Sequence, residues 1–91
     1  MQIKKPVKWD NIWRIVIFDI PEQNKKAREA FRSHLKRLNF YSLQKSVFVH
    51  PYNCKEEIDF LKHDLGIANF ITYLEARHID NQNLLRNHFQ V

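Results

Sequence analysis

The chain has 91 residues, of which 44% are hydrophobic and 27% are charged, a composition that supports one small folded domain. Lys and Arg number 15 against 10 Asp and Glu, so the net charge is +5 and a polyanionic partner is favoured. The single glycine, Gly66, excludes Gly-rich phosphate loops, and no apolar run is long enough to span a membrane. The single cysteine, Cys54, allows no internal disulfide and predicts a reducing, cytoplasmic setting.

The first 11 residues are polar and basic, and Trp9 is the most prominent apolar side chain among them. We expect residues 1–11 to form a lead-in or linker and residues 12–91 to form a single domain. Trp9 is the side chain of this segment that could pack back on the domain.

The apolar run 13–20 is rich in β-branched and aromatic residues and is closed by Pro21, which is typical of a buried strand. Side chains alternate along a strand, so Ile17 lies on one face while Val16 and Phe18 lie on the other. Both faces of this strand are therefore apolar, and both need cover.

Asn24 is expected to cap a helix that runs to about Leu38, and Asn39 suits its exit. Two strands follow at 40–43 and 47–50, separated by a break at 44–46. The apolar positions of the helix recur at the spacing of a helix laid on a sheet. They are Ala27, Ala30, Phe31, Leu35 and Leu38.

A second helix is expected to start at Asn53, where Glu56 completes a pattern close to a capping box, and to stop at Gly66. A fourth strand follows at 70–76. Asp80 is then expected to cap a short last helix. The packing side chains of that helix are Leu84, Leu85 and Phe89.

This order of elements, with right-handed crossovers, predicts an α+β fold of the ferredoxin-like βαββαβ type. Two helices would cover one face of a four-stranded antiparallel sheet, and a short C-terminal helix would follow. The second face would keep apolar side chains with only the tail available to cover it. We therefore expect a second copy of the chain to cover that face in a twofold homodimer.

Two segments of the chain resemble a known family. The sequence VIFDIP at 16–21, the basic helix after it, and LQKSVF at 43–48 resemble the small CRISPR-associated "Cas two" family of spacer acquisition, part of antiviral defence. The resemblance implies a ferredoxin-like homodimer. It also implies a scaffold that bridges integrase subunits and holds duplex DNA through phosphate contacts, with no chemistry of its own.

The sequence is also similar to that of the central domain of PaaX-type transcriptional repressors, which shares this fold. The residues at 5–10 and 13–14 look like the start of that domain, and Glu22 and the segment 49–52 also fit. In those repressors a winged-helix DNA reader precedes the domain, and these 91 residues are not expected to contain one. The chain is thus either a free-standing Cas-two-like protein or the dimerisation domain of a PaaX-like repressor.

Asp19 ends the first strand, at the position of an acid in the Cas-two-like family. The resemblance implies that two copies of Asp19 could share Mg²⁺ at a dimer axis, as in a Mg²⁺-dependent endonuclease. The structural alternative is that its carboxylate accepts hydrogen bonds from backbone N–H groups of the following turn and helix. Glu22 is the nearest other acid and has no supportive spacing, so we rank the scaffold first, the repressor domain second and the endonuclease last.

The first helix is strongly basic on its outer face, and Lys45 adds charge between the second and third strands. These side chains are predicted to contact nucleic-acid phosphates without reading sequence, and the alternative is an ordinary solvated face. The family often has a basic residue where this chain has Ser42. The predicted phosphate-binding residues are Lys25, Lys26, Arg28, Arg32, Lys36, Arg37 and Lys45.

Three other kinds of site are disfavoured by the sequence. Ser46 has no evident base beside it, so it is not expected to act as a nucleophile. The five histidines lack zinc-site spacing, and one cysteine cannot complete a thiolate site. An RNA-recognition module would need a Lys/Arg-Gly-aromatic strand motif, which the position of the single glycine rules out.

Overall fold

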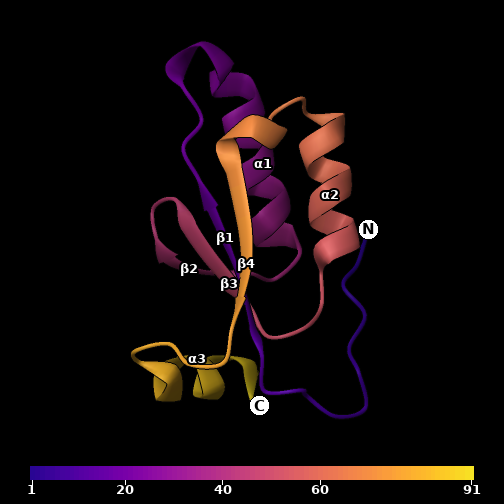
Figure 1. Cartoon of the computed structure of the whole chain (residues 1–91), viewed down its shortest axis with the longest axis vertical. Coiled ribbons are helices and arrows are strands. Elements are labelled where there is room, and N and C mark those ends of the chain that lie inside the picture. The colour runs from indigo at the N-terminus through magenta and orange to yellow at the C-terminus, as the bar shows by residue number, and fades with distance from the viewer.

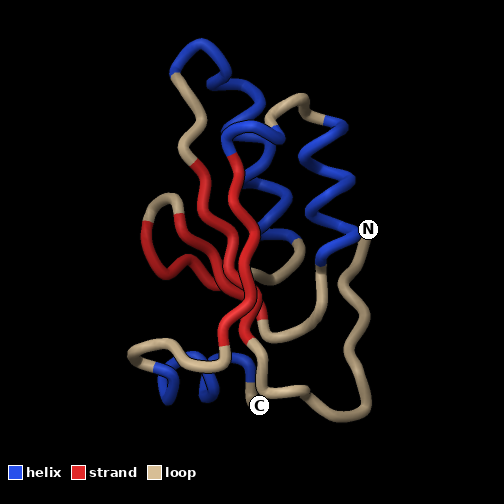
Figure 2. The backbone as a smooth tube through the Cα atoms, viewed as in Figure 1, coloured by secondary structure: helices blue, strands red, loops and turns tan.

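A computed structural model describes all residues 1–91 and confirms the expected α+β, ferredoxin-like order of strands and helices (Figure 1). The four antiparallel strands lie in the order β2-β3-β1-β4, so β1 is flanked on both sides (Figure 2). The elements are β1 (Trp13–Phe18), α1 (Lys25–Arg37), β2 (Tyr41–Gln44), β3 (Val47–His50), α2 (Lys55–Asp64), β4 (Ile71–Ala76) and α3 (Gln82–Phe89). Short 3₁₀ turns precede α1 at Glu22–Asn24 and β4 at Ala68–Phe70.

The predicted starts of α2 and α3 were wrong by one residue. The N-cap of α2 is Cys54 rather than Asn53, whose Oδ1 accepts a hydrogen bond from the backbone N–H of Lys55 at 3.2 Å, an Asx turn in place of the capping box. The N-cap of α3 is Asn81, which has a φ of 66° that asparagine tolerates, while Asp80 is exposed. Asn24 is the N-cap of α1 as predicted, but its side chain makes no capping hydrogen bond.

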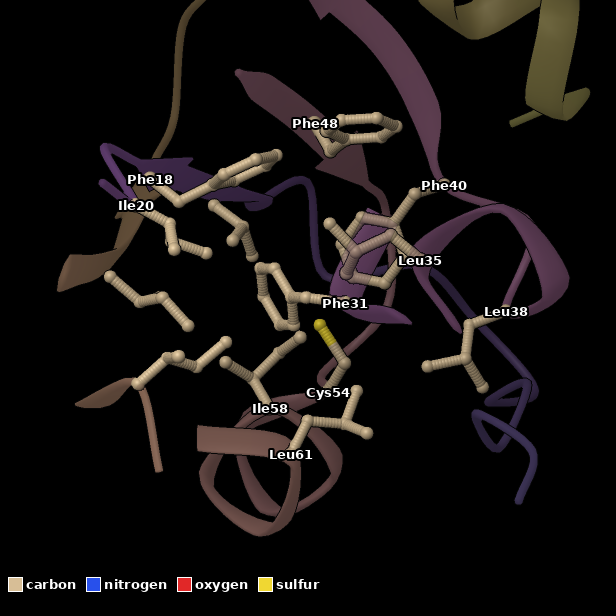
Figure 3. Close-up of a cluster of buried hydrophobic side chains, with 13 residues drawn as sticks. Phe18, Ile20, Phe31, Leu35, Leu38, Phe40, Phe48, Cys54, Ile58 and Leu61 are labelled. Atoms are coloured by element: carbon tan, nitrogen blue, oxygen red, sulfur yellow. The ribbon is translucent and has the colours of Figure 1, made fainter. Parts of the chain in front are cut away.

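The main core lies between one face of the sheet and the two helices α1 and α2 (Figure 3). Phe18 from β1 meets Phe31 from α1 edge-on, with ring centroids 5.3 Å apart, and stacks on Phe48 from β3 at 5.8 Å. The Cys54 thiol is buried in this core, and desolvation raises its pKa to about 12. This thiol therefore stays protonated, as expected of a structural cysteine.

The second face of the sheet is covered at one end only. Trp13, Val49 and Leu85 form a small second core there, in which α3 packs on β1 and β3. The indole N–H of Trp13 donates to Oε1 of Gln82 at 3.1 Å, which fixes the start of α3. Ile17 lies on the same face of β1, four residues after Trp13, and is 40% exposed. The tail therefore folds over its own sheet and leaves the other end of this face open.

No helix combines the length and the apolar character needed to cross a membrane.

His50 is the last residue of β3. It is buried among side chains that connect α1, α3 and the sheet. Its Nδ1 accepts a hydrogen bond from the backbone N–H of Tyr52 at 3.1 Å, and its ring lies 5.0 Å from Phe40 and 5.7 Å from Phe89 between centroids. Burial of the imidazole lowers its pKa from 6.5 to about 4. The folded protein thus holds His50 uncharged at neutral pH.

This burial predicts a loss of stability in mild acid. Between pH 6.5 and about 4 the unfolded chain binds a proton at His50 that the folded chain does not. The free energy of unfolding should therefore decrease as the pH is lowered through this window, by on the order of 3 kcal/mol from this residue. Urea unfolding at a series of pH values measures this slope. His50→Phe should flatten it, and the exposed-site control His78→Gln should leave it unchanged. An unaltered slope in His50→Phe would contradict the assignment.

Candidate nucleic-acid interface

Asp19 follows the last residue of β1 and has a fixed backbone and a free side chain. Its backbone N–H donates to the carbonyl of Phe70 at 2.9 Å, and the N–H of Phe18 donates to the carbonyl of Ser46 at 3.1 Å. The Asp19 side chain is exposed and makes no hydrogen bond. The structural alternative of a helix-capping carboxylate is therefore not realised, because no side-chain capping bond forms at the turn or at α1.

A shallow hollow of about 340 Å³ brings Asp19 together with part of the basic side chains expected from the sequence. It lies where the end of β1 meets the first half of α1 and the β2–β3 turn. Its lining residues include Asp19, Arg28, Arg32, Lys45 and Ser46, together with Glu22 and Glu29. The hollow thus holds both signs of charge, and the remaining predicted phosphate-binding residues lie outside it.

The two arginines of the hollow are already engaged by acids of the same chain. Arg28 donates to the carbonyl of Ile20 and to Oε2 of Glu22, both at 3.2 Å. Arg32 donates to both carboxylate oxygens of Glu29, at 2.7 and 2.9 Å. The Arg32 guanidinium also lies 5.5 Å from the ring centroid of Phe18. These contacts fix Arg28 and Arg32 in place and offset much of their charge.

The unpaired positive charge lies elsewhere on α1. Lys25 and Lys26 at its start, and Lys36 and Arg37 at its end, are exposed and form no ion pair. Lys45 in the β2–β3 turn is likewise exposed and unpaired. Flexible exposed cations of this kind suit phosphate contacts that carry no sequence information. They form two separate groups, one at each end of α1.

The side chains around Asp19 do not fit a magnesium site within one chain. Mg²⁺ prefers several oxygen ligands at short range. The carboxylates that share the hollow, Glu22 and Glu29, are paired with arginines, and no group of three or more potential metal ligands occurs anywhere in the structure. Within this hollow one chain therefore offers a single free carboxylate, that of Asp19.

A second polar centre, absent from the sequence-based predictions, lies at the other end of β1. The Arg14 side chain is only 6% exposed, and its two terminal nitrogens donate to both carboxylate oxygens of Asp10 at 2.9 and 2.7 Å. Nη1 also donates to the carbonyl of Pro51 at 2.9 Å. The Arg14 guanidinium lowers the pKa of the Asp10 carboxyl, chiefly through these hydrogen bonds.

Trp9, in the N-terminal segment, packs beside the Arg14–Asp10 pair. Its indole N–H donates to the carbonyl of Pro51 at 2.6 Å, and its ring meets Trp13 edge-on at 4.7 Å. The guanidinium of Arg86 from α3 lies 4.9 Å from the centroid of the Trp9 ring. Residues 9–14 therefore tie the N-terminal segment to the β3–α2 connection and to α3. The signal available in the sequence was an arginine within an apolar strand, four residues after an aspartate.

The sequence-family model for the PaaX protein central Cas2-like domain matches residues 6–86 of this chain. The chain belongs to this family. No curated protein matches the sequence.

The family match includes residues 9–14, because a PaaX-type Cas2-like domain is recognised from residue 6 onward. Trp9, Asp10 and Arg14 all lie within the matched range. Trp9 and Arg14 donate to the carbonyl of Pro51 in the β3–α2 connection, and the Asp10 carboxylate accepts from Arg14. The segment 6–11, expected from sequence to belong to a lead-in, is thus covered by the family match.

The exposed, unbonded carboxylate predicts that Asp19→Asn has little effect on the fold of this PaaX-type domain. The free energy of unfolding should change by less than about 0.5 kcal/mol, because no hydrogen bond or ion pair is lost. Chemical denaturation measures this change. For a scaffold without chemistry, we also expect that neither the parent chain nor Asp19→Asn cleaves duplex DNA in the presence of Mg²⁺. A loss of stability well above 1 kcal/mol would give Asp19 a structural role, and cleavage that disappears in Asp19→Asn would make it a catalytic ligand.

Proposed function

We propose that this chain is a non-catalytic dimerisation module of a PaaX-type transcriptional regulator. In this role two copies meet through the part of the sheet that α3 leaves open. The module then holds two regulator subunits in fixed relative positions. The observation that carries this proposal is the incompletely covered second face of the sheet.

We call that surface the open strip and define it as Ile15, Ile17, Val47, Thr72 and Leu74. The strand register supports its continuity, because Ile17 lies opposite Val47 on one side and Thr72 on the other, and Ile15 lies opposite Leu74. Ile17 is 40% exposed, Thr72 is exposed, and the other members are half-buried. The strip crosses three strands and carries no charge. Such a surface is costly to leave in water and suits a self-complementary twofold contact.

A charge placed in the open strip should separate the two copies. Ile17→Lys would bury an ammonium group in an apolar contact, so we expect the dimer dissociation constant to rise at least about tenfold. Sedimentation velocity over a range of concentrations in about 0.5 M salt, which leaves an apolar contact intact and screens charged ones, measures this constant. Ser42→Lys places the same side chain at an exposed position of β2 on the opposite face of the sheet, and it should leave dimerisation unchanged. A monomeric parent chain, or a dimer indifferent to Ile17→Lys, would contradict the proposal.

The unpaired cations of α1 favour a second candidate role. In it the homodimer is the scaffold of a CRISPR spacer-acquisition complex, which holds duplex DNA through phosphate contacts and bridges integrase subunits. Lys25, Lys26, Lys36 and Arg37 support it, since each is exposed and has no acidic partner. The family match itself supports the regulator and the scaffold equally, because both carry the Cas2-like fold.

Phosphate contacts predict a specific salt dependence. The logarithm of the affinity for duplex DNA should fall linearly with the logarithm of salt concentration. Replacing Lys25 and Lys26 by Gln should lower the magnitude of this slope by about two per chain, whereas Arg28→Gln should lower it less because Glu22 already pairs with Arg28. Fluorescence anisotropy with a labelled duplex gives the slope. A slope near zero in the parent chain would remove DNA binding, and equal effects of the two variants would contradict the division between free and paired cations.

A further inference from the structure

The two helices on the same face of the sheet carry opposite charge. Within α1 there are six Lys and Arg and one Glu, whereas α2 has four acids and two Lys. Figure 1 shows α1 and α2 side by side on the sheet. Because β1 and β3 are antiparallel and each is followed by a helix that returns along the sheet, α1 and α2 also run in opposite directions. The helical layer thus has a basic half and an acidic half.

The acidic half has an aromatic side chain at its outer surface. Phe60 lies in the middle of α2 and is 54% exposed, the largest exposed fraction of any Phe, Tyr or Trp in the chain. Glu56 precedes it by four residues and Asp64 follows it by four, so both carboxylates lie beside the ring on the helix surface. Asp59 is also exposed and pairs only with exposed Lys55 of the same helix, at 2.8 Å, a contact of little energetic weight.

The basic half offers the complementary surface. Lys36 and Arg37 are exposed and unpaired at the end of α1. Ser33 lies one turn before them on the same outer side and is the smallest exposed residue of the helix. Nη2 of Arg37 lies 3.5 Å from Oγ of Ser33, so a cation borders this small side chain, and such a surface suits an aromatic ring bordered by acids. One chain therefore carries both members of a complementary pair.

We propose that the helical layer is a second self-association surface, in which α1 of one copy lies against α2 of another about a twofold axis parallel to the helices. This symmetry sets each basic helix opposite an acidic helix, so the complementary contact occurs twice. The end of α1 then meets the start of the facing helix because the two run in opposite directions. Lys36 and Arg37 approach the partner's Glu56 and the partner's Asp59, and Phe60 lies toward the partner's Ser33.

This contact is distinct from the dimer proposed above, since it uses the layer of helices and the other uses the opposite face of the sheet. It is also polar at its rim, so salt should weaken it, whereas an apolar contact through the open strip should resist salt. The same Lys36 and Arg37 are candidate phosphate contacts. Duplex DNA should therefore compete with association through the helical layer.

A charge exchange tests the contact. The starting chain is Ile17→Lys, which isolates the helical layer whether or not the open strip forms a dimer. Its self-association, measured by sedimentation equilibrium, should weaken at least about tenfold between about 0.05 M and about 0.5 M salt. Lys36→Glu with Arg37→Glu should weaken it by at least about tenfold, and so should Glu56→Lys with Asp59→Lys. All four changes in one chain should restore it, because opposite charges again face each other.

Two further variants separate this contact from a general effect of charge. Lys45→Glu with Arg77→Glu makes the same change in net charge at exposed positions outside the helical layer, and it should leave association unchanged. Phe60→Ala should weaken association by about tenfold, because the ring lies at the centre of the proposed contact. Failure of the four-residue exchange to restore association would overturn the proposal, as would the absence of any association at low salt.

Discussion

The whole fold depends on a central strand that is apolar on both faces. β1 lies between β3 and β4. Its Val16 and Phe18 side chains are covered by α1 and α2. The alternate residues Trp13, Ile15 and Ile17 point to the other face of the sheet. A four-stranded sheet with two helices can bury only one face by itself. The chain covers part of the second face with α3, and the remainder is the surface on which the proposed dimer rests. Fold and assembly thus follow from the same constraint.

Charge is arranged on a different principle from the apolar side chains. Around Asp19, both arginines are paired with acids of the same chain, as in the Glu29–Arg32 pair, so the side chains that one chain places in this hollow do not fit a magnesium site. The unmatched charge lies along the outer surfaces of the helices, basic on α1 and acidic on α2. The charges that have no partner within the chain thus lie on surfaces open to other molecules.

The sequence predicted the fold because local signals repeat along each element. The strand order follows from hydrophobic periodicity and crossover rules, and the two predicted helix exits, Asn39 and Gly66, both have positive φ, at 69° and 65°. Helix starts were less accurate, because the φ and ψ of a single residue decide between Asp80 and Asn81. The Arg14 centre could not be read from the sequence. Its acceptors include a carbonyl 37 residues away, and only the folded sheet brings that carbonyl to the strand.

The central claim is that the open strip is covered by a second copy in solution. Small-angle X-ray scattering on the unmodified chain tests it most directly, because forward scattering gives the mass and the low-angle slope gives the radius of gyration. In about 0.5 M salt, where association through the helical layer is weakened, the account predicts twice the 11.1 kDa mass of one chain and a radius of gyration clearly above the 12.9 Å of the single chain. A mass of 11.1 kDa with a radius close to that of the single chain, at concentrations where the protein is stable, would contradict it.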